Sequence, residues 1–165
     1  MININFEKLI DDCKVTFFLG LSQKVVSEFS ENKYKVSAQN AIDCCWNWLQ
    51  SKECDGEYLY NLLGDEECGI TLIQEVAENE KDKVAWNCII DAVAYTSRKA
   101  YELEGEKYYP EPIELVDDSI VQHFINCFNN CVSNSDGYIQ RVYSFLSEYK
   151  SYSNNSLKNE IINLI

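Results

Sequence analysis

The sequence predicts an all-α protein, a single-domain helical bundle of about seven or eight helices over residues 1–165, arranged around a central apolar helix. Three observations favour this class. Only two prolines and six glycines occur, apolar residues recur at helical spacing, and no valine-rich run alternates as a strand would. With 46% hydrophobic and 13% aromatic residues, a chain of 165 residues can bury a sizeable core.

The first helical region is expected over residues 5–31, where apolar side chains recur at spacings of three and four. β-Branched and aromatic residues, followed by a glycine, occupy positions 15–20 and allow a break in this region. Residues 32–36 are polar and are expected to form a turn.

A second helix is expected over residues 38–51, with Ser37 as its N-cap. Its predicted inward face consists of Ala41, Cys44, Cys45, Trp48 and Leu49. Trp46 and Trp48 are two positions apart and cannot share one helix face. One is therefore expected in the core and the other at a boundary or on the surface, where tryptophan is a typical interface hot spot.

Two short helices are predicted next. The third helix begins at Asp55-Gly56 and ends at Gly64, and the fourth extends over about 70–78. The acidic loop 65–68 is expected to be exposed, and residues 79–83 are expected to form a charged turn before the next helix. The predicted apolar faces of the two helices comprise Tyr58, Leu59, Leu62 and Leu63, and Ile70, Leu72, Ile73, Val76 and Ala77.

Residues 84–104 are expected to form the central helix. Nearly every position is apolar or small, and the clear polar exceptions are Asn87, Asp91, Arg98 and Glu102. Their spacing places them on one stripe of a 3.6-residue helix, so the remaining surface must pack against other helices. The stripe is too thin for an ordinary surface helix, and its charges exclude a membrane span.

The central helix is expected to end at Gly105. Pro110 and Pro112 are expected to exclude helix from the next segment. That segment is predicted to cross a face of the bundle, held there by Tyr108, Tyr109 and Ile113.

Three more helices complete the prediction. One extends over about 118–133, with Asp117 or Asp118 as its cap. Another extends over about 138–150 after a Ser-Asp-Gly turn, and a short helix over 157–165 ends the chain.

The net charge of −13 is confined to the middle of the chain. Residues 1–52 carry six acids and six bases, and residues 119–165 carry three of each. Residues 53–118 carry 18 acids and five bases. Such a field repels nucleic acid and anionic membranes and attracts basic partners. We therefore expect no nucleic-acid partner and no membrane partner.

Eight cysteines occur, but no two form a CxxC pair. Cys44 and Cys45 are adjacent and point about 100° apart on a helix, so they cannot bind one ion together. The N-terminus carries acids and no apolar run, unlike a signal peptide. These observations favour a cytoplasmic protein with free, buried thiols, because a reducing compartment disfavours disulfides.

The lone histidine, His123, precedes Cys127 by four positions and Cys131 by eight. His123 and Cys127 could hold zinc or act as a Cys–His nucleophile, but either role needs further groups that the sequence does not identify. Cys131 lies ~12 Å from His123 along a helix axis and cannot join the same ion. One histidine also excludes the paired Glu-x-x-His motifs of a di-iron bundle.

A packed helix face is the simpler interpretation of His123 and Cys127. The sequence contains no P-loop, GxGxxG, GxSxG, HExxH or calcium-loop pattern. We therefore expect no enzyme activity, no metal and no cofactor. Asp91 is expected to be either a buried acid with a raised pKa or a hydrogen-bonded, partly solvated member of the polar stripe.

Two motifs give the chain a family resemblance: WNCIIDAVAY at 86–95 and KYYPEPIE at 107–114. Together with AIDCCWNW at 41–48 and EYLY at 57–60, they resemble the sixth class of all-α immunity proteins from bacterial polymorphic toxin systems. The resemblance covers about residues 15–130. It implies a protein that binds and neutralises a toxin encoded beside it.

We therefore expect a cytoplasmic immunity protein that covers a basic toxin domain, with electrostatic steering of the encounter. The candidate toxin-binding residues are Asp55, Glu57, Asp65, Glu66, Glu67, Glu75, Glu78, Glu111 and Glu114. Each of these acids is equally compatible with a solvated side chain that has no partner. The alternatives are a non-catalytic helical scaffold or regulatory protein, homodimeric through Trp46 or Trp48, and an enzyme that uses His123 and Cys127.

Overall fold

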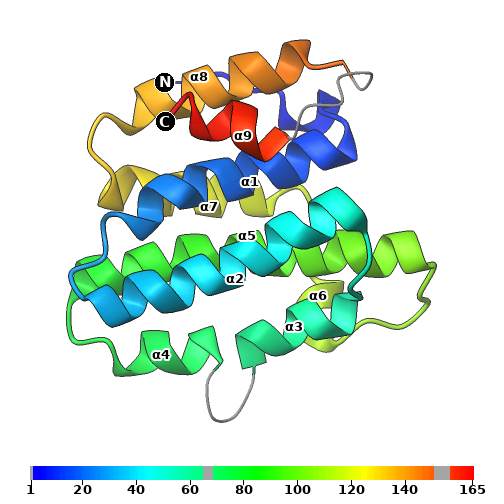
Figure 1. The fold of residues 1–165 in the computed structure, drawn as a ribbon, viewed down its shortest axis with the longest axis horizontal. Coiled ribbons are helices and arrows are strands. Elements are labelled where there is room, and N and C mark those ends of the chain that lie inside the picture. The colour runs from blue at the N-terminus through cyan, green and yellow to red at the C-terminus, as the bar shows by residue number, and fades with distance from the viewer. Residues whose placement is uncertain (1, 65–68, 151–156) are drawn as a thin grey trace.

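The computed structural model describes residues 2–64, 69–150 and 157–165 (Figure 1). In this part of the chain the secondary structure is entirely helical, which confirms the predicted all-α class. The helices exceed the predicted seven or eight: a 3₁₀ turn precedes nine α-helices in the described residues. Their bounds are η1 Phe6–Lys8, α1 Asp11–Val26, α2 Asn32–Ser51, α3 Gly56–Gly64, α4 Ile70–Val76, α5 Glu80–Glu104, α6 Glu111–Glu114, α7 Ile120–Cys131, α8 Ser135–Glu148 and α9 Leu157–Ile162.

Helix α5 is the central helix, as predicted, and packs against α1, α2, α3, α4, α6 and α7. It begins four residues before the predicted start, so the predicted turn at 79–83 is wrong. The Asn79 side chain accepts a hydrogen bond from the backbone N–H of Lys81 and caps the helix. Gly105 ends α5 in the left-handed conformation, with φ 73°.

Helix α1 is a second core helix, in addition to the predicted central helix. Every residue from 15 to 22 is buried, and α1 packs against α2, α5, α7, α8 and α9. The possible break at 15–20 does not occur, because packing on all sides outweighs the low helix propensity of this run. Gly20 allows α9 to approach closely, since a Cβ at this position would overlap the Ile161 side chain.

Helix α2 begins six residues before its predicted start. Residues 32–36 therefore form helix rather than a polar turn, and Glu31 instead of Ser37 occupies the N-cap position. No side-chain hydrogen bond caps this end, so tertiary packing determines where the helix begins.

Both α2 tryptophans are buried, so the prediction that one lies at a boundary is wrong. Trp46 and Trp48 are each 3% exposed. The indole N–H of Trp46 donates to Oε1 of Gln23 in α1 at 3.0 Å, and Nζ of Lys52 lies 4.6 Å from the Trp48 ring centroid. Two faces of α2 are covered because α2 contacts α1 and α5 as well as α3 and α4.

Helices α3 and α4 cover one side of the core. The bounds of α3 match the prediction, and α4 ends two residues earlier than expected. Tyr58, Leu72 and Val76 were predicted to face inward but are 50%, 39% and 65% exposed. The prediction for these side chains is wrong because each short helix has only one face on the core and solvent on the others. The loop 65–68 lies outside the described residues.

The proline-containing segment includes a helix, contrary to the prediction. Pro112 occupies an early position of α6, where its missing N–H leaves no hydrogen bond unmade. Ile113 is fully buried and holds the segment to the bundle, as predicted. Tyr108 does not, because it is 88% exposed. Tyr109 is half-buried and packs on the Arg98 guanidinium, whose carbon lies 4.2 Å from the ring centroid.

Two further predictions near α7 and α8 are wrong. Neither Asp117 nor Asp118 occupies the N-cap position of α7, which belongs to Ser119. Asp117 instead accepts a hydrogen bond from the Ser119 backbone N–H at 2.8 Å. Helix α8 begins within the expected turn because Asn134, at φ 55°, already redirects the chain.

The helices form a layered arrangement around α5 (Figure 1). Helices α3, α4 and α6 lie on one side of it, and we call them the acidic layer because they carry acids of residues 53–118. Helices α1, α8 and α9 lie on the other side. None of the described helices is long and apolar enough to cross a bilayer.

Candidate functional site

The lone histidine belongs to a three-residue cluster between α5 and α7. Nδ1 of His123 lies 2.6 Å from Oδ2 of Asp91, and Nε2 lies 3.8 Å from Sγ of Cys127. Asp91 is buried and hydrogen-bonded, and burial raises its pKa to about 6 although contact with His123 opposes the shift. Of the two predictions for Asp91, the buried acid with a raised pKa therefore fits better than the partly solvated member of the polar stripe.

This cluster has the order of a catalytic thiol–imidazole–carboxylate arrangement but not its electrostatics. Burial raises the pKa of the Cys127 thiol, and the Asp91 carboxylate raises it further. A nucleophilic cysteine needs the opposite shift, because the thiolate is the reactive form. Within the described residues, no group of three or more His, Cys, Asp and Glu side chains is arranged to hold a metal ion. The cluster therefore joins α5 to α7 by packing and polar contact.

The structure places six of the nine candidate acids in or beside the acidic layer. Asp55 and Glu57 lie at the start of α3, Glu75 in α4 and Glu78 shortly after it. Glu111 and Glu114 are the end residues of α6. All six are exposed. Asp65, Glu66 and Glu67 lie outside the described residues.

Asp55 also has a structural role. Its Oδ1 accepts a hydrogen bond from the backbone N–H of Tyr58 at 2.7 Å, which caps α3. The next residue, Gly56, joins α3 to α5: its N–H donates to Oε1 of Glu104 at 2.7 Å, and its carbonyl accepts from the Ser97 hydroxyl at 2.8 Å. Glu104 was not among the candidate residues, because spacing along one helix does not show which α3 atoms it meets.

The carboxylates of Glu57 in α3, Glu104 in α5 and Asp55 just before α3 all influence the phenol of Tyr101. Burial raises the pKa of Tyr101, and the charges of Glu57, Glu104 and Asp55 raise it further. Residues nearly 50 positions apart in the sequence therefore contribute to one negative field.

The six described candidate acids differ from most acids of residues 1–52 in having no ionic partner in the described chain. Among the described residues, the ion pairs include none of the six described candidates. In contrast, five of the six acids in residues 1–52 have a lysine partner, namely Asp11, Asp12, Glu28, Glu31 and Asp43. An exposed acid without a partner keeps its full charge in the surrounding field.

An apolar groove of about 420 Å³ lies between α2, α3 and α4. Four lining residues of α2 recur at helical spacing, three from α3 do the same, and α4 adds its first residue. Sγ of Cys44 and Oη of Tyr58 approach to 3.6 Å between α2 and α3. None of the lining residues is charged; they are Ser37, Asn40, Ala41, Cys44, Tyr58, Asn61, Leu62 and Ile70.

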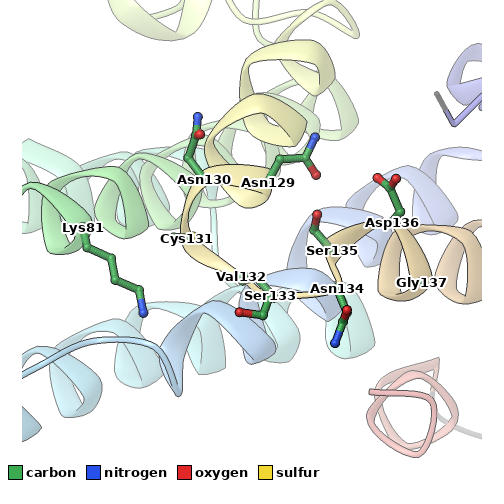
Figure 2. Close-up of a pocket in the computed structure, with 10 residues that line it drawn as sticks. All are labelled: Lys81, Asn129, Asn130, Cys131, Val132, Ser133, Asn134, Ser135, Asp136 and Gly137. Carbon is green, nitrogen blue, oxygen red and sulfur yellow. The ribbon is translucent and has the colours of Figure 1, made fainter.

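A larger hollow of about 920 Å³ lies at the turn between α7 and α8 (Figure 2). Asn129–Gly137 line most of it with amides and hydroxyls, and Lys81 reaches toward it from α5. Its single base, Lys81, is paired with Glu28 at 3.1 Å, and its single acid is Asp136. This hollow is open and polar and has no charge excess that would select a basic partner.

Comparison with known proteins gives one finding. A family model described as Immunity protein Imm6 matches residues 13–131. The curated proteins and the solved structures that were compared with the chain include no match. The matched range runs from α1 to the end of α7 and thus includes the acidic layer and the groove.

Proposed function

Because the chain belongs to the Imm6 immunity protein family, we propose that it neutralises a basic toxin domain by binding to it in the cytosol. The acidic layer is the observation that supports a basic toxin. Its candidate acids are exposed and have no ionic partner in the described chain, whereas most acids of residues 1–52 are paired. An uncompensated negative surface favours a partner with complementary positive charge.

In the proposed mechanism the acidic layer covers the working surface of the toxin. Long-range attraction would raise the association rate by one to three orders of magnitude, and the bound immunity protein would then exclude the toxin's substrate. Where the toxin cleaves nucleic acid, carboxylates would occupy positions that phosphates take in the substrate complex. No chemical step on the immunity protein is required.

The Asp91–His123–Cys127 cluster has no role in this proposal. Cys127 is 8% exposed, and burial favours the protonated form of its thiol. Replacement of Cys127 by alanine is therefore expected to leave toxin neutralisation intact.

The test uses the purified toxin domain encoded beside this gene. The variant Glu57→Lys/Glu75→Lys reverses two unpaired acids of the acidic layer. We expect binding about 100-fold weaker, mostly through a slower association rate, and a smaller dependence of binding on salt. Reversal of Asp65, Glu66 and Glu67 is expected to have a similar effect.

The control is Asp136→Lys/Glu148→Lys in α8, which changes the net charge by the same amount outside the acidic layer. Surface plasmon resonance at two salt concentrations measures both variants. If the wild-type chain does not bind the toxin domain, the proposed function is wrong. Equal losses in the two variants would mean that net charge, rather than the acidic layer, attracts the toxin.

A further inference from the structure

We propose that the groove between α2, α3 and α4 receives an apolar side chain of the basic toxin, and that lysines or arginines flanking this side chain meet the unpaired acids around it. This inference rests on the proposed function and names the part of the acidic layer at which the contact is centred. Binding energy in protein interfaces is concentrated at such points, where a side chain fills a pocket surrounded by polar contacts.

The groove has the form of a receptor for one side chain or one helical turn. Its two walls are helix stripes at spacings of three and four, from Ser37 to Cys44 on α2 and from Tyr58 to Leu62 on α3. Ala41 and Ile70 are buried, and Cys44 and Leu62 are half-buried, so the floor is apolar. Asn40 and Asn61 are exposed lining residues that can hydrogen-bond to a partner's backbone.

Apolar surface extends beyond the groove. Tyr58 is 50% exposed, and Val36, one turn before Asn40 on α2, is 52% exposed. Tyr58 is also held in place, because its hydroxyl contacts Sγ of Cys44. A fixed and half-exposed aromatic ring loses little conformational entropy when a partner covers it, which suits it to be an interface anchor.

The charges around the groove select a basic partner. Neither a lysine nor an arginine is among the lining residues. Glu57 lies one turn before Asn61 on α3, and Glu75 lies on α4, which supplies Ile70 to the groove. Both acids are exposed and are without an ionic partner in the described chain.

The same charges argue against a second copy of this chain as the occupant. Two copies that met at their grooves would bring Glu57 and Glu75 of each toward the same unpaired acids of the other. Like charges opposed in this way disfavour association. A basic partner, in contrast, would be attracted by the acids that would repel a second copy.

Two substitutions at exposed lining positions test the groove without altering the core. Asn61→Trp places a large ring on an exposed lining position, and Tyr58→Ala removes the exposed anchor. Each variant is titrated with the purified toxin domain encoded beside the gene, and we expect dissociation constants at least tenfold higher than for the wild type. Asn126→Trp, at an exposed asparagine of α7, is the matched control and is expected to bind as the wild type does.

The outcomes separate this inference from the proposed function. If the wild type binds and both groove variants bind within about twofold of it, the groove is not the contact and only this inference is wrong. An equal loss in Asn126→Trp would overturn it as well, since the effect would then not depend on the groove. If the free chain is a dimer in light scattering and Asn61→Trp is a monomer, the groove is a self-association site and the inference is wrong. Thermal unfolding at the wild-type midpoint verifies that each variant is folded.

Discussion

The acids of residues 1–52 and those of the acidic layer differ in what surrounds them. In the first region five of six acids have a lysine within ion-pair distance, and these lysines lie in α2, α5 and α9 or, for Lys52, directly after α2. In the acidic layer the six described candidates are exposed and have no such partner. The charges of the first group are compensated by nearby lysines, whereas those of the second group remain available to a binding partner.

This difference indicates which charges the fold uses. An acid paired at a helix contact is part of the structure, although an exposed pair contributes little to it. An acid without an ionic partner adds repulsion to the native state and has no ion pair to compensate it. Replacing acids of the first kind should therefore affect stability more than binding. Replacing those of the second kind should do the reverse, except at Asp55, which also caps α3.

The largest effect is expected at the contact that holds the acidic layer to α5. A Cβ in Gly56→Ala would lie 2.6 Å from Cγ and Cδ2 of Tyr101, whose ring is buried and packed against Tyr109. We expect the free energy of unfolding to fall by about 2–3 kcal/mol, because neither the ring nor the backbone can move freely. Toxin binding should weaken as well, because α3 loses its position.

Gly64→Ala is the matched control for this substitution. Within the described chain, no heavy atom lies within 4 Å of a Cβ at Gly64. Urea unfolding should show stability equal to or slightly above that of the wild type. If Gly56→Ala is also neutral, the acidic layer is not held by this contact.

A smaller loss of stability, without loss of binding, is expected for Lys14→Ala. Nζ of Lys14 lies 2.6 Å from Oδ2 of Asp118, and their side chains are only 11% and 28% exposed. Removal of the lysine leaves the Asp118 carboxylate with the hydroxyl of Tyr95 and should cost about 2 kcal/mol. Lys33→Ala breaks an exposed pair with Glu31 and should cost less than about 0.5 kcal/mol. A binding defect in Lys14→Ala, measured on folded protein, would contradict the separation.

Adjacent acids at the start of α3 allow a finer comparison. Asp55→Ala removes the cap of α3 and should lower the free energy of unfolding by about 1 kcal/mol. Asp55→Asn keeps a capping oxygen and should retain most of that stability. Glu57→Ala should leave stability within about 0.5 kcal/mol of the wild type but weaken toxin binding severalfold. Thermal unfolding measures the stability of the three variants, and titration measures their toxin binding. Equal stability and equal binding of Asp55→Ala and Glu57→Ala would contradict the assignment of a capping role to Asp55 and a binding role to Glu57.

The smallest effect concerns Asp91, the buried acid whose partner is a histidine. Burial raises its pKa from an ordinary 3.8 to about 6, so the native state binds this proton more tightly than the unfolded chain does. The contribution of Asp91 to stability therefore falls as the pH rises from about 4 to 6. Relative to Asp91→Asn, the wild type should lose about 1 kcal/mol between pH 5 and 6.

Urea unfolding at these pH values, above the isoelectric point of about 4.4, measures the difference. Parallel pH profiles for the wild type and Asp91→Asn would show that Asp91 has an ordinary pKa. Toxin binding at constant pH should not change in this variant, because Asp91 lies between α5 and α7 and is buried.

The central helix could be predicted from periodicity because a helix with a single polar stripe must be surrounded. The stripe members Arg98 and Glu102 pair at 2.9 Å, as their spacing of four requires. Local spacing failed where burial came from several directions. Helix α1 and the two tryptophans of α2 are enclosed by helices that lie far away in the sequence, and no pattern within one helix reports these neighbours.

The candidate site likewise has features that could be predicted from the sequence and features that could not. The excess of acids in residues 53–118 is a property of composition and could be counted directly. Which acids pair, which one caps a helix and which meet around Tyr101 depends on atoms brought together by folding. The groove could not be predicted either, because its walls belong to three helices whose relative positions are set by packing on α5.

The sequence by itself determined the all-α class, the central helix, the location of the charge excess and the family resemblance. These depend on residue types and on spacings within one segment, which the chain fixes before it folds. Only the tertiary structure decided the second core helix, the Asp91–His123–Cys127 contact, the partners of the acids and the groove. Each of these depends on distances between segments remote in sequence, and such distances exist only once the helices have packed.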